Sequence, residues 1–416
     1  MAGHTHGNGI LARIAPALSH RNFRLYIAGQ AVSVTGSWIQ TVAISWTLYT
    51  LTDSATLLGL AAFLVQGPQL LLTPAAGAWI ENRNRWLLLL LVQIANAALA
   101  FTLALMFWRN LADAPTILLA SAVLGLLNSF DTPLRQSLLC DLVNDRADLS
   151  SAIALNASIF TGGRFLGPPL AGLLLATSPP AACFFINGLS FTVIIGALLL
   201  IDGRDQPTPG GPPAPWFQAL LDGLRLSIGT PSIHLPLAQL CAVNMMASSA
   251  LVLAPLIVGQ TFQAKPDSLG WLLGTAGAGA LSATFLMAGK RNLADLSRLL
   301  RWAPYLGVAG LFLIGGSRNV QSALIGMFAV GASVALTNVT TNAILQGTAA
   351  AAFRTRIIAL FAAVRFGTDA LGSLLTGMLA GSIGPHSAIS LAAAALLGLS
   401  LWLTPRLRRL QFLHGG

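Results

Sequence analysis

Long apolar runs dominate this sequence and limit what it can fold into. A hydrocarbon core about 30 Å thick is crossed by a helix of about 20 apolar residues. Twelve runs meet that length, at residues 24–51, 54–80, 86–108, 115–139, 150–177, 181–201, 233–262, 267–289, 297–316, 319–346, 356–382 and 386–404. They are continuous, whereas the strands of a membrane barrel alternate in polarity over about ten residues. We therefore predict an all-α membrane protein with twelve transmembrane helices.

The shortage of charge supports the same fold class. Only 9% of the 416 residues are charged, whereas a soluble domain carries about 25%. So little charge cannot cover a water-facing surface. A soluble enzyme, a disordered chain and a fibrous repeat are therefore excluded.

The basic residues set the expected orientation. The chain has 23 Lys and Arg against 13 Asp and Glu, a net charge of +10. They stand in twos and threes between apolar runs, so we expect contact with anionic lipid and not with nucleic acid. With the N-terminus inside, 18 fall in cytoplasmic segments and 3 in outer loops. This bias predicts a bacterial inner-membrane protein with both termini in the cytoplasm.

The residue patterns needed for enzymatic or metal chemistry are absent from the sequence. It has three cysteines without a CxxC pair or a histidine at zinc spacing, and no GxxxxGK[ST] phosphate loop. His4 and His6 lie in a polar N-terminal tail, and the spanning runs contain only His234 and His386, near helix ends. We predict neither an enzyme nor a cofactor or metal site.

A segment rich in proline and glycine divides the chain into halves. Residues 207–215 contain five prolines and two glycines, which is typical of a linker. We expect the first apolar run to be a retained helix and not a cleaved signal. The predicted organisation is a cytoplasmic tail 1–23, a six-helix bundle 24–201, a cytoplasmic linker 202–232, a second six-helix bundle 233–404 and a cytoplasmic tail 405–416.

The two halves also repeat each other. When the sequence is shifted by 205 residues, Gly167 falls on Gly372 and Gly172 falls on Gly377. The fifth run thus repeats as the eleventh. Parallel repeats about an axis along the membrane normal are one of the transporter architectures.

Two motifs resemble those of the major facilitator superfamily. The loop after the second run has a glycine, an acid four residues later and basic residues, with Glu for the usual Asp and without the Arg that normally follows. The fifth run resembles the Gly-x-x-x-Gly-Pro signature of the antiporter subset, which implies export. Glycines permit close helix approach and proline bends a helix, although a Gly/Pro helix adapted to lipid is the alternative. The resemblance implies gating roles for Gly77, Glu81, Arg83, Arg85, Gly163, Gly167, Pro168 and Gly172.

A narrower resemblance, to the enterobactin-exporter-like or transmembrane secretion effector branch, covers the first five runs. It is carried by residues 22–25, 29–30, 38–41, 45–46, 130–136 and 154–156. That branch includes siderophore exporters and drug or macrolide efflux proteins. The resemblance implies an exporter that alternates between inward-open and outward-open states, and we expect a monomer.

Charged residues inside apolar runs mark the candidate site, because each costs at least about 2.5–3.5 kcal/mol on insertion scales. Asp131 and Arg135 share a helix face and are expected to pair, as a gate latch, a proton site or a boundary ion pair. Arg164 lies about 21 Å along its helix, where it needs a cavity or a carboxylate. Arg365 and Asp369 either lock their helix as a pair or belong to a proton site. We take Asp131 and Asp369 as the proton-coupling candidates.

Uncharged polar residues lie on the first, fourth, seventh and tenth runs, which line the central cavity in the superfamily. Each amide alone could instead join two helices. Trp38 and Trp46, eight residues apart, could form an aromatic wall, although Trp46 could equally belong to an interfacial belt. With Arg164 and Arg365, the predicted substrate-binding residues are Gln30, Ser37, Trp38, Asn128, Asn244, Asn338 and Asn342.

The sequence therefore predicts secondary export of a siderophore-like or amphipathic small molecule in exchange for protons. One alternative is multidrug efflux of lipophilic cations, which would depend on Asp131 or Asp369 and little on Arg164. A second alternative is a non-transporting sensor or scaffold on the same fold, which would drive no flux.

Overall fold

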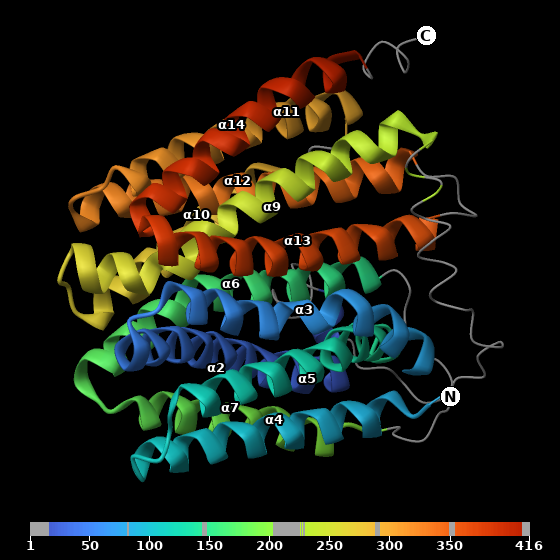
Figure 1. Cartoon of the computed structure of the whole chain (residues 1–416). Helices are drawn as coiled ribbons and strands as arrows, with labels where there is room; N and C mark the ends of the chain where they lie inside the picture. Colours follow the sequence, from blue (N-terminus) through green and yellow to red (C-terminus); the bar gives the residue numbers. More distant parts are fainter. Residues whose placement is uncertain are drawn as a thin grey trace, which may run out of the picture.

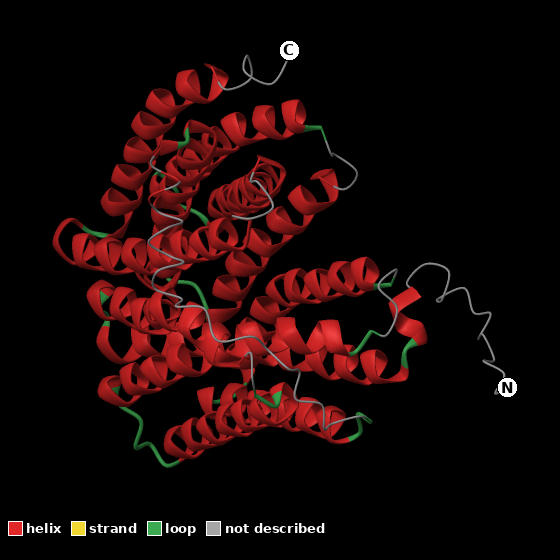
Figure 2. Cartoon of the chain, turned by 90° about the vertical axis from the view of Figure 1, so that its right-hand side faces the viewer, coloured by secondary structure: helices red, strands yellow, loops and turns green. Residues whose placement is uncertain are grey.

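The computed structural model describes residues 16–80, 83–143, 148–202, 225, 227, 229–287, 292–348 and 354–409. Within these ranges the chain forms helices and loops and no strand (Figure 2). The first half contains η1 (Pro16–Ser19), α2 (Arg21–Thr52), α3 (Ala55–Ile80), α4 (Arg85–Trp108), α5 (Ala114–Asp141), α6 (Leu149–Thr177) and α7 (Pro180–Leu199). The second half contains α9 (Pro231–Leu256), η2 (Ile257–Thr261), α10 (Pro266–Met287), α11 (Leu293–Gly315), α12 (Val320–Thr348), α13 (Arg354–Ile383) and α14 (Pro385–Arg409). The predicted all-α class with twelve long helices is confirmed.

Caps and prolines set many of the helix ends. Asn84 caps α4 by accepting a hydrogen bond from the Leu87 N–H, and Asp113 caps α5 by accepting from the Thr116 N–H. The Thr116 hydroxyl and N–H together hold the pKa of the Asp113 carboxyl below its usual range. Helices α7, α9, α10 and α14 begin at a proline, whose missing N–H is not needed in the first turn.

The long helices form two bundles. Helices α2–α7 pack together as the first bundle and α9–α14 as the second, seen in the lower and upper parts of Figure 1. The main contacts between the bundles are α3 against α13 and α6 against α10. The start of α2 and the end of α14 lie at one end of the molecule, here called the terminal end, and the other is the far end (Figure 1). Most of the predicted linker lies outside the described residues, as do 1–15 and 410–416.

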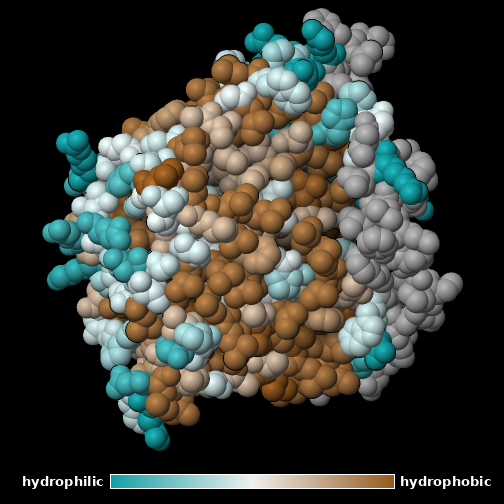
Figure 3. All heavy atoms as spheres, in the orientation of Figure 1, coloured by the Kyte–Doolittle hydropathy of each residue, from teal (hydrophilic) through white to brown (hydrophobic). Residues whose placement is uncertain are grey.

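The surface is that of a membrane protein. Figure 3 shows a broad hydrophobic surface over the middle of the molecule, with hydrophilic residues gathered at the far end. Ten of the described helices are long and apolar enough to cross a membrane. The remaining two long helices are α2, which has amides and hydroxyls along its length, and α11, whose first turns contain Asp295, Arg298 and Arg301. The chain is a multi-pass membrane protein.

Candidate functional site

Two glycine pairs build the helix crossings that join the bundles. At the α6–α10 crossing, a Cβ added to Gly172 would lie 2.9 Å from the Gly270 Cα. At the α3–α13 crossing, a Cβ added to Gly377 would lie 2.7 Å from the Gly59 Cα. Gly172 and Gly377 are equivalent under the 205-residue repeat, so both crossings use the same contact. Only glycine permits backbones to approach this closely.

The other glycines of the fifth-run motif face their own bundle. A Cβ at Gly163 would lie 2.6 Å from Val34, and one at Gly167 would lie 2.4 Å from the Trp38 Cβ, both on α2. The Pro168 carbonyl instead faces Gly270 of α10. Through this motif, α6 therefore packs against α2 near the middle of α6 and against α10 nearer the far end.

A polar contact lies near the middle of the α3–α13 crossing. Gln66 Nε2 on α3 donates to an Asp369 carboxylate oxygen on α13 at 2.8 Å, and Gln69 donates to Gln66 Oε1 at 3.0 Å. Within the described residues, Asp369 forms no ion pair with Arg365, four residues earlier on the same helix. The carboxylate thus bonds across the two bundles and not along its own helix.

Arginines from both bundles lie within electrostatic range of this carboxylate. Arg164 interacts with the charges of Arg365 and Asp369, and Arg365 interacts with Asp369. Each guanidinium also lies near an aromatic ring, Arg164 at 5.6 Å from the Trp38 centroid and Arg365 at 5.2 Å from Phe366. We call Gln66, Arg164, Arg365 and Asp369 the inter-bundle cluster. Its two positive charges exceed its one negative charge.

A second polar cluster lies inside the first bundle. Asp131 accepts hydrogen bonds from Arg135 Nε at 2.6 Å and from Gln93 Nε2 at 2.5 Å, and Arg135 Nη2 donates to Gln93 Oε1 at 3.1 Å. The Arg135 side chain is only 6% exposed. The predicted pairing of Asp131 with Arg135 is confirmed. We call these three residues the intra-bundle cluster, which joins α4 to α5.

Asn244 and Asn338, two of the predicted polar residues of the second bundle, lie close together. Asn338 Nδ2 on α12 lies 3.3 Å from Asn244 Oδ1 on α9, and it also donates to its own helix at Val334 O. Asn342 accepts from Gln346 of the same helix at 3.0 Å. The amides of Asn244 and Asn338 therefore join α9 to α12, which is the contact expected if these amides link two helices.

The predicted polar residues of the first bundle bond mostly within it. Gln30 donates to Asn156 Oδ1 on α6 at 2.7 Å, and the Ser37 hydroxyl donates to Ser33 O of its own helix. Asn128 is half-buried on α5. Sequence reasoning missed Gln66 and Gln93, although each is an amide inside an apolar run, and it used Asn156 only as part of the family resemblance.

The loop motif after α3 makes a local contact and an ion pair. Glu81 lies outside the described residues, and a Cβ at Gly77 would contact nothing within 4 Å. The Arg83 guanidinium lies 4.2 Å from the Trp79 ring centroid. Arg85 Nη1 pairs with Asp141 at 3.1 Å, which joins the start of α4 to the end of α5.

The bundles also contact each other at the far end. Gln260 Nε2 of η2 donates to Asp53 at the end of α2 at 2.9 Å. The Tyr49 ring packs so closely on Gly259 that a Cβ there would lie 2.0 Å from its hydroxyl. In the described part, the hydrogen bonds between bundles lie at this end or near the middle of the helices.

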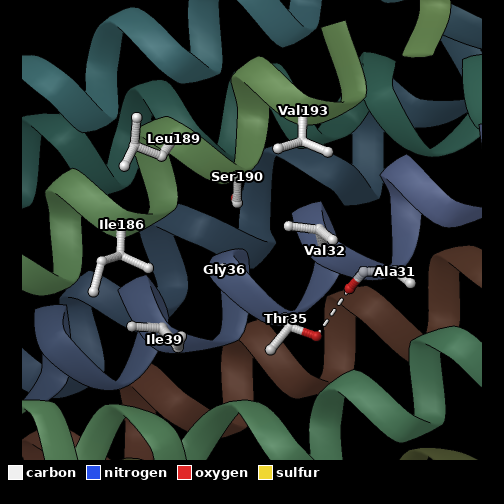
Figure 4. A pocket seen from close by; sticks show the side chains of 9 residues that line it. All are labelled: Ala31, Val32, Thr35, Gly36, Ile39, Ile186, Leu189, Ser190 and Val193. Carbon is white, nitrogen blue, oxygen red and sulfur yellow. Dashed lines mark hydrogen bonds between the residues drawn. The ribbon is translucent and has the colours of Figure 1, made fainter. Parts of the chain in front are cut away.

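An open groove of about 500 Å³ lies on the first bundle, between α2 and α7 (Figure 4). The hydroxyl of Thr35 in this groove donates to Ala31 O of its own helix at 2.9 Å. The lining is almost entirely apolar and suits lipid chains better than a polar substrate. The lining residues are Ala31, Val32, Thr35, Gly36, Ile39, Ile186, Leu189, Ser190 and Val193.

Solved structures of transporters share this fold. The nucleoside transporter NupG (D323A mutant) aligns with a TM-score of 0.72 and 12% identity, over 92% of this chain and 99% of that one. A bacterial homolog of the human lysosomal transporter Spinster, inward-facing and unoccupied, aligns with a TM-score of 0.70 and 14% identity, over 94% and 97%.

Sequence relatives cover most of the chain. The staphyloferrin A transporter of Staphylococcus aureus is 24% identical over 66% of this chain and 70% of its own length. The multidrug efflux pump Tap of Mycolicibacterium fortuitum is 25% identical over 90% of this chain and 94% of its own. The family described as transmembrane secretion effector matches residues 12–412. The chain therefore belongs to the transmembrane secretion effector family of the major facilitator superfamily, and it is a membrane transporter and not an enzyme.

Proposed function

We propose that this transporter exports a small siderophore-like organic compound in exchange for protons, and that the inter-bundle cluster binds both. The observation that carries the proposal is that Arg164 and Arg365, one from each bundle, lie within electrostatic range of the Asp369 carboxylate near the middle of their helices. Ionised groups at this depth are costly unless they serve a pathway or a partner. The excess positive charge suits a substrate with anionic groups.

The far-end contacts support alternating access. Tyr49 against Gly259 and Asp53 with Gln260 close the bundles at the far end. The excess of basic residues in the segments at the terminal end supports a cytoplasmic location for that end. The structure would then be inward-open. Transport would rock bundle 24–201 against bundle 233–404 about the two glycine crossings.

Exchange sets a requirement on the substrate. A purely anionic compound on Arg164 and Arg365 would favour protonation of Asp369, which gives cotransport with the proton. Exchange requires the substrate and the proton to compete for the Asp369 carboxylate. We therefore propose a substrate that presents anionic groups to the two arginines and a hydrogen-bond donor or cationic group to Asp369. Asp131, bonded on both oxygens within one bundle, is the second proton candidate.

Flux into inside-out vesicles tests the proposal. With an inside-acid pH gradient, we expect uptake of an amphoteric siderophore that collapses with the gradient and is lost in Asp369→Asn. Arg164→Gln and Arg365→Gln should weaken siderophore uptake. Siderophore uptake that does not depend on the gradient, or that Asp369→Asn leaves unchanged, contradicts the role of Asp369 in exchange.

Multidrug efflux is the second candidate, and it is favoured by the Tap relatives, which align over 90% of this chain or more. It predicts uptake of a lipophilic cationic dye in the same vesicles, abolished by Asp369→Asn and little affected by Arg164→Gln. Uptake of neither compound by folded protein would favour another substrate or a sensor.

A further inference from the structure

Arginine and tryptophan side chains gather at the terminal end of the second bundle, on its outer helices α11 and α14. The two helices pack there through Leu300, Leu403 and Leu407, and the Tyr305 hydroxyl lies 3.0 Å from the Thr404 hydroxyl. This surface, the arginine–tryptophan surface, consists of Arg298, Arg301, Trp302, Trp402, Arg406, Arg408 and Arg409. None of these residues belongs to the inter-bundle cluster.

The surface carries an excess of positive charge. Arg301 lies within electrostatic range of Arg408 on the neighbouring helix and of Arg298 on its own. The sequences of α11 and α14 contain a single acidic residue, Asp295, against the five arginines. Like charges held this close repel one another, so a negatively charged partner would stabilise the surface.

The tryptophans place this charge at the membrane boundary. Trp302 and Trp402 are 60% and 54% exposed, which suits rings at the headgroup level. Arg301 is about 12 Å along α11 from Leu293, so Arg298 and Arg301 precede the apolar part of the helix. Arg406 is fixed against Trp402, with its guanidinium 3.7 Å from the ring centroid and its Nη1 donating to Trp402 O at 2.6 Å.

We propose that the arginine–tryptophan surface binds the headgroup of an anionic phospholipid. The phosphate would lie against Arg298, Arg301 and Arg408, and the glycerol and upper acyl chains would lie along Trp302 and Trp402. Guanidinium groups match phosphate oxygens in charge and geometry. Basic surfaces between membrane helices at the cytoplasmic boundary commonly bind anionic headgroups. The boundary position of both tryptophans favours a lipid over a soluble anion.

Lipid titration of the purified full-length chain tests the proposal. Phosphatidylglycerol should raise the midpoint of thermal unfolding, whereas phosphatidylcholine and inorganic phosphate should not. Each arginine near the surface contributes about fivefold in affinity, so Arg298→Gln with Arg408→Gln should weaken phosphatidylglycerol binding about 25-fold. Both side chains are exposed, so this double variant should fold.

Two control variants keep the experiment decisive. Arg24→Gln removes an exposed arginine at the terminal end of the first bundle and should leave the lipid response unchanged. Arg298→Lys with Arg408→Lys keeps the charge and should retain most of the affinity. An equal response in the wild type and the glutamine double variant overturns the proposal, as does a response to phosphate that matches the response to phosphatidylglycerol.

Discussion

The intra-bundle and inter-bundle clusters contain the same kinds of side chain in different arrangements. Each has an aspartate that accepts a hydrogen bond from a glutamine on a neighbouring helix, Gln93 for Asp131 and Gln66 for Asp369. Each also has an arginine four residues away on the same helix. In the intra-bundle cluster, Arg135 forms an ion pair with Asp131. Within the described residues of the inter-bundle cluster, Arg365 forms no ion pair with Asp369.

The order of the two residues explains this difference. Helical side chains lean toward the N-terminus of the helix. Arg135 follows Asp131, so it leans back over the acid, whereas Arg365 precedes Asp369 and leans away from it. The intra-bundle charges are therefore paired within one bundle. Within the described residues, the Asp369 carboxylate is not paired along α13 and instead accepts a hydrogen bond from Gln66 of the other bundle.

The largest expected effect comes from breaking the intra-bundle cluster. Asp131→Ala leaves Arg135 buried without its carboxylate, which should reduce the free energy of unfolding by about 3–5 kcal/mol. Denaturant unfolding and the yield of monodisperse protein measure the loss. A stable Asp131→Ala protein that transports without a pH gradient would instead make Asp131 the proton site.

The two glycine crossings allow the next comparison. A Cβ at Gly172 or Gly377 would meet backbone atoms at 2.9 or 2.7 Å, so Gly172→Ala and Gly377→Ala should each cost about 1–3 kcal/mol through overpacking. Spectroscopic distances between labels on the two bundles should show wider separation at the far end. Gly398→Ala is the matched control, because nothing lies within 4 Å of its added Cβ. Equal distances in all three variants would contradict a pivot at these glycines.

Reversing the order of the charges tests the explanation itself. Arg365→Asp combined with Asp369→Arg gives α13 the same order as Asp131 and Arg135. A well-paired buried ion pair is close to neutral in free energy, so stability should change little, and transport should be lost because the charges then satisfy each other. Thermal unfolding and vesicle flux measure the two effects. Retained transport would show that the unpaired arrangement is not needed.

The sequence predicted the helices well because length and polarity alone decide which segments enter a bilayer. The Asp131–Arg135 pair was also predictable, because both partners lie on one helix face. Gln66 and Gln93 were missed because their role depends on which helices become neighbours. Whether Arg365 and Asp369 form an ion pair was left open, although the arginine precedes the aspartate, and that order disfavours pairing along the helix. The far-end contact of Tyr49 with Gly259 depends on the bundle arrangement, which local patterns do not encode.

The smallest expected effect lies at the loop after α3, where the ion pair is partly exposed. The Arg85 and Asp141 side chains are 20% and 44% exposed, so the pair lies at the surface and water reaches both charges. Arg85→Gln should therefore cost about 0–1 kcal/mol, and the cost should shrink at high salt because exposed charges are screened. A double-mutant cycle with Asp141→Asn at low and high salt isolates the pair.

The resemblance to a gating motif predicts a different result for Arg85→Gln, in which stability is unchanged but flux falls sharply. Because the ion-pair partner of Arg85 among the described residues lies in the same bundle, a large flux defect would require a different partner for Arg85 in the outward-open state.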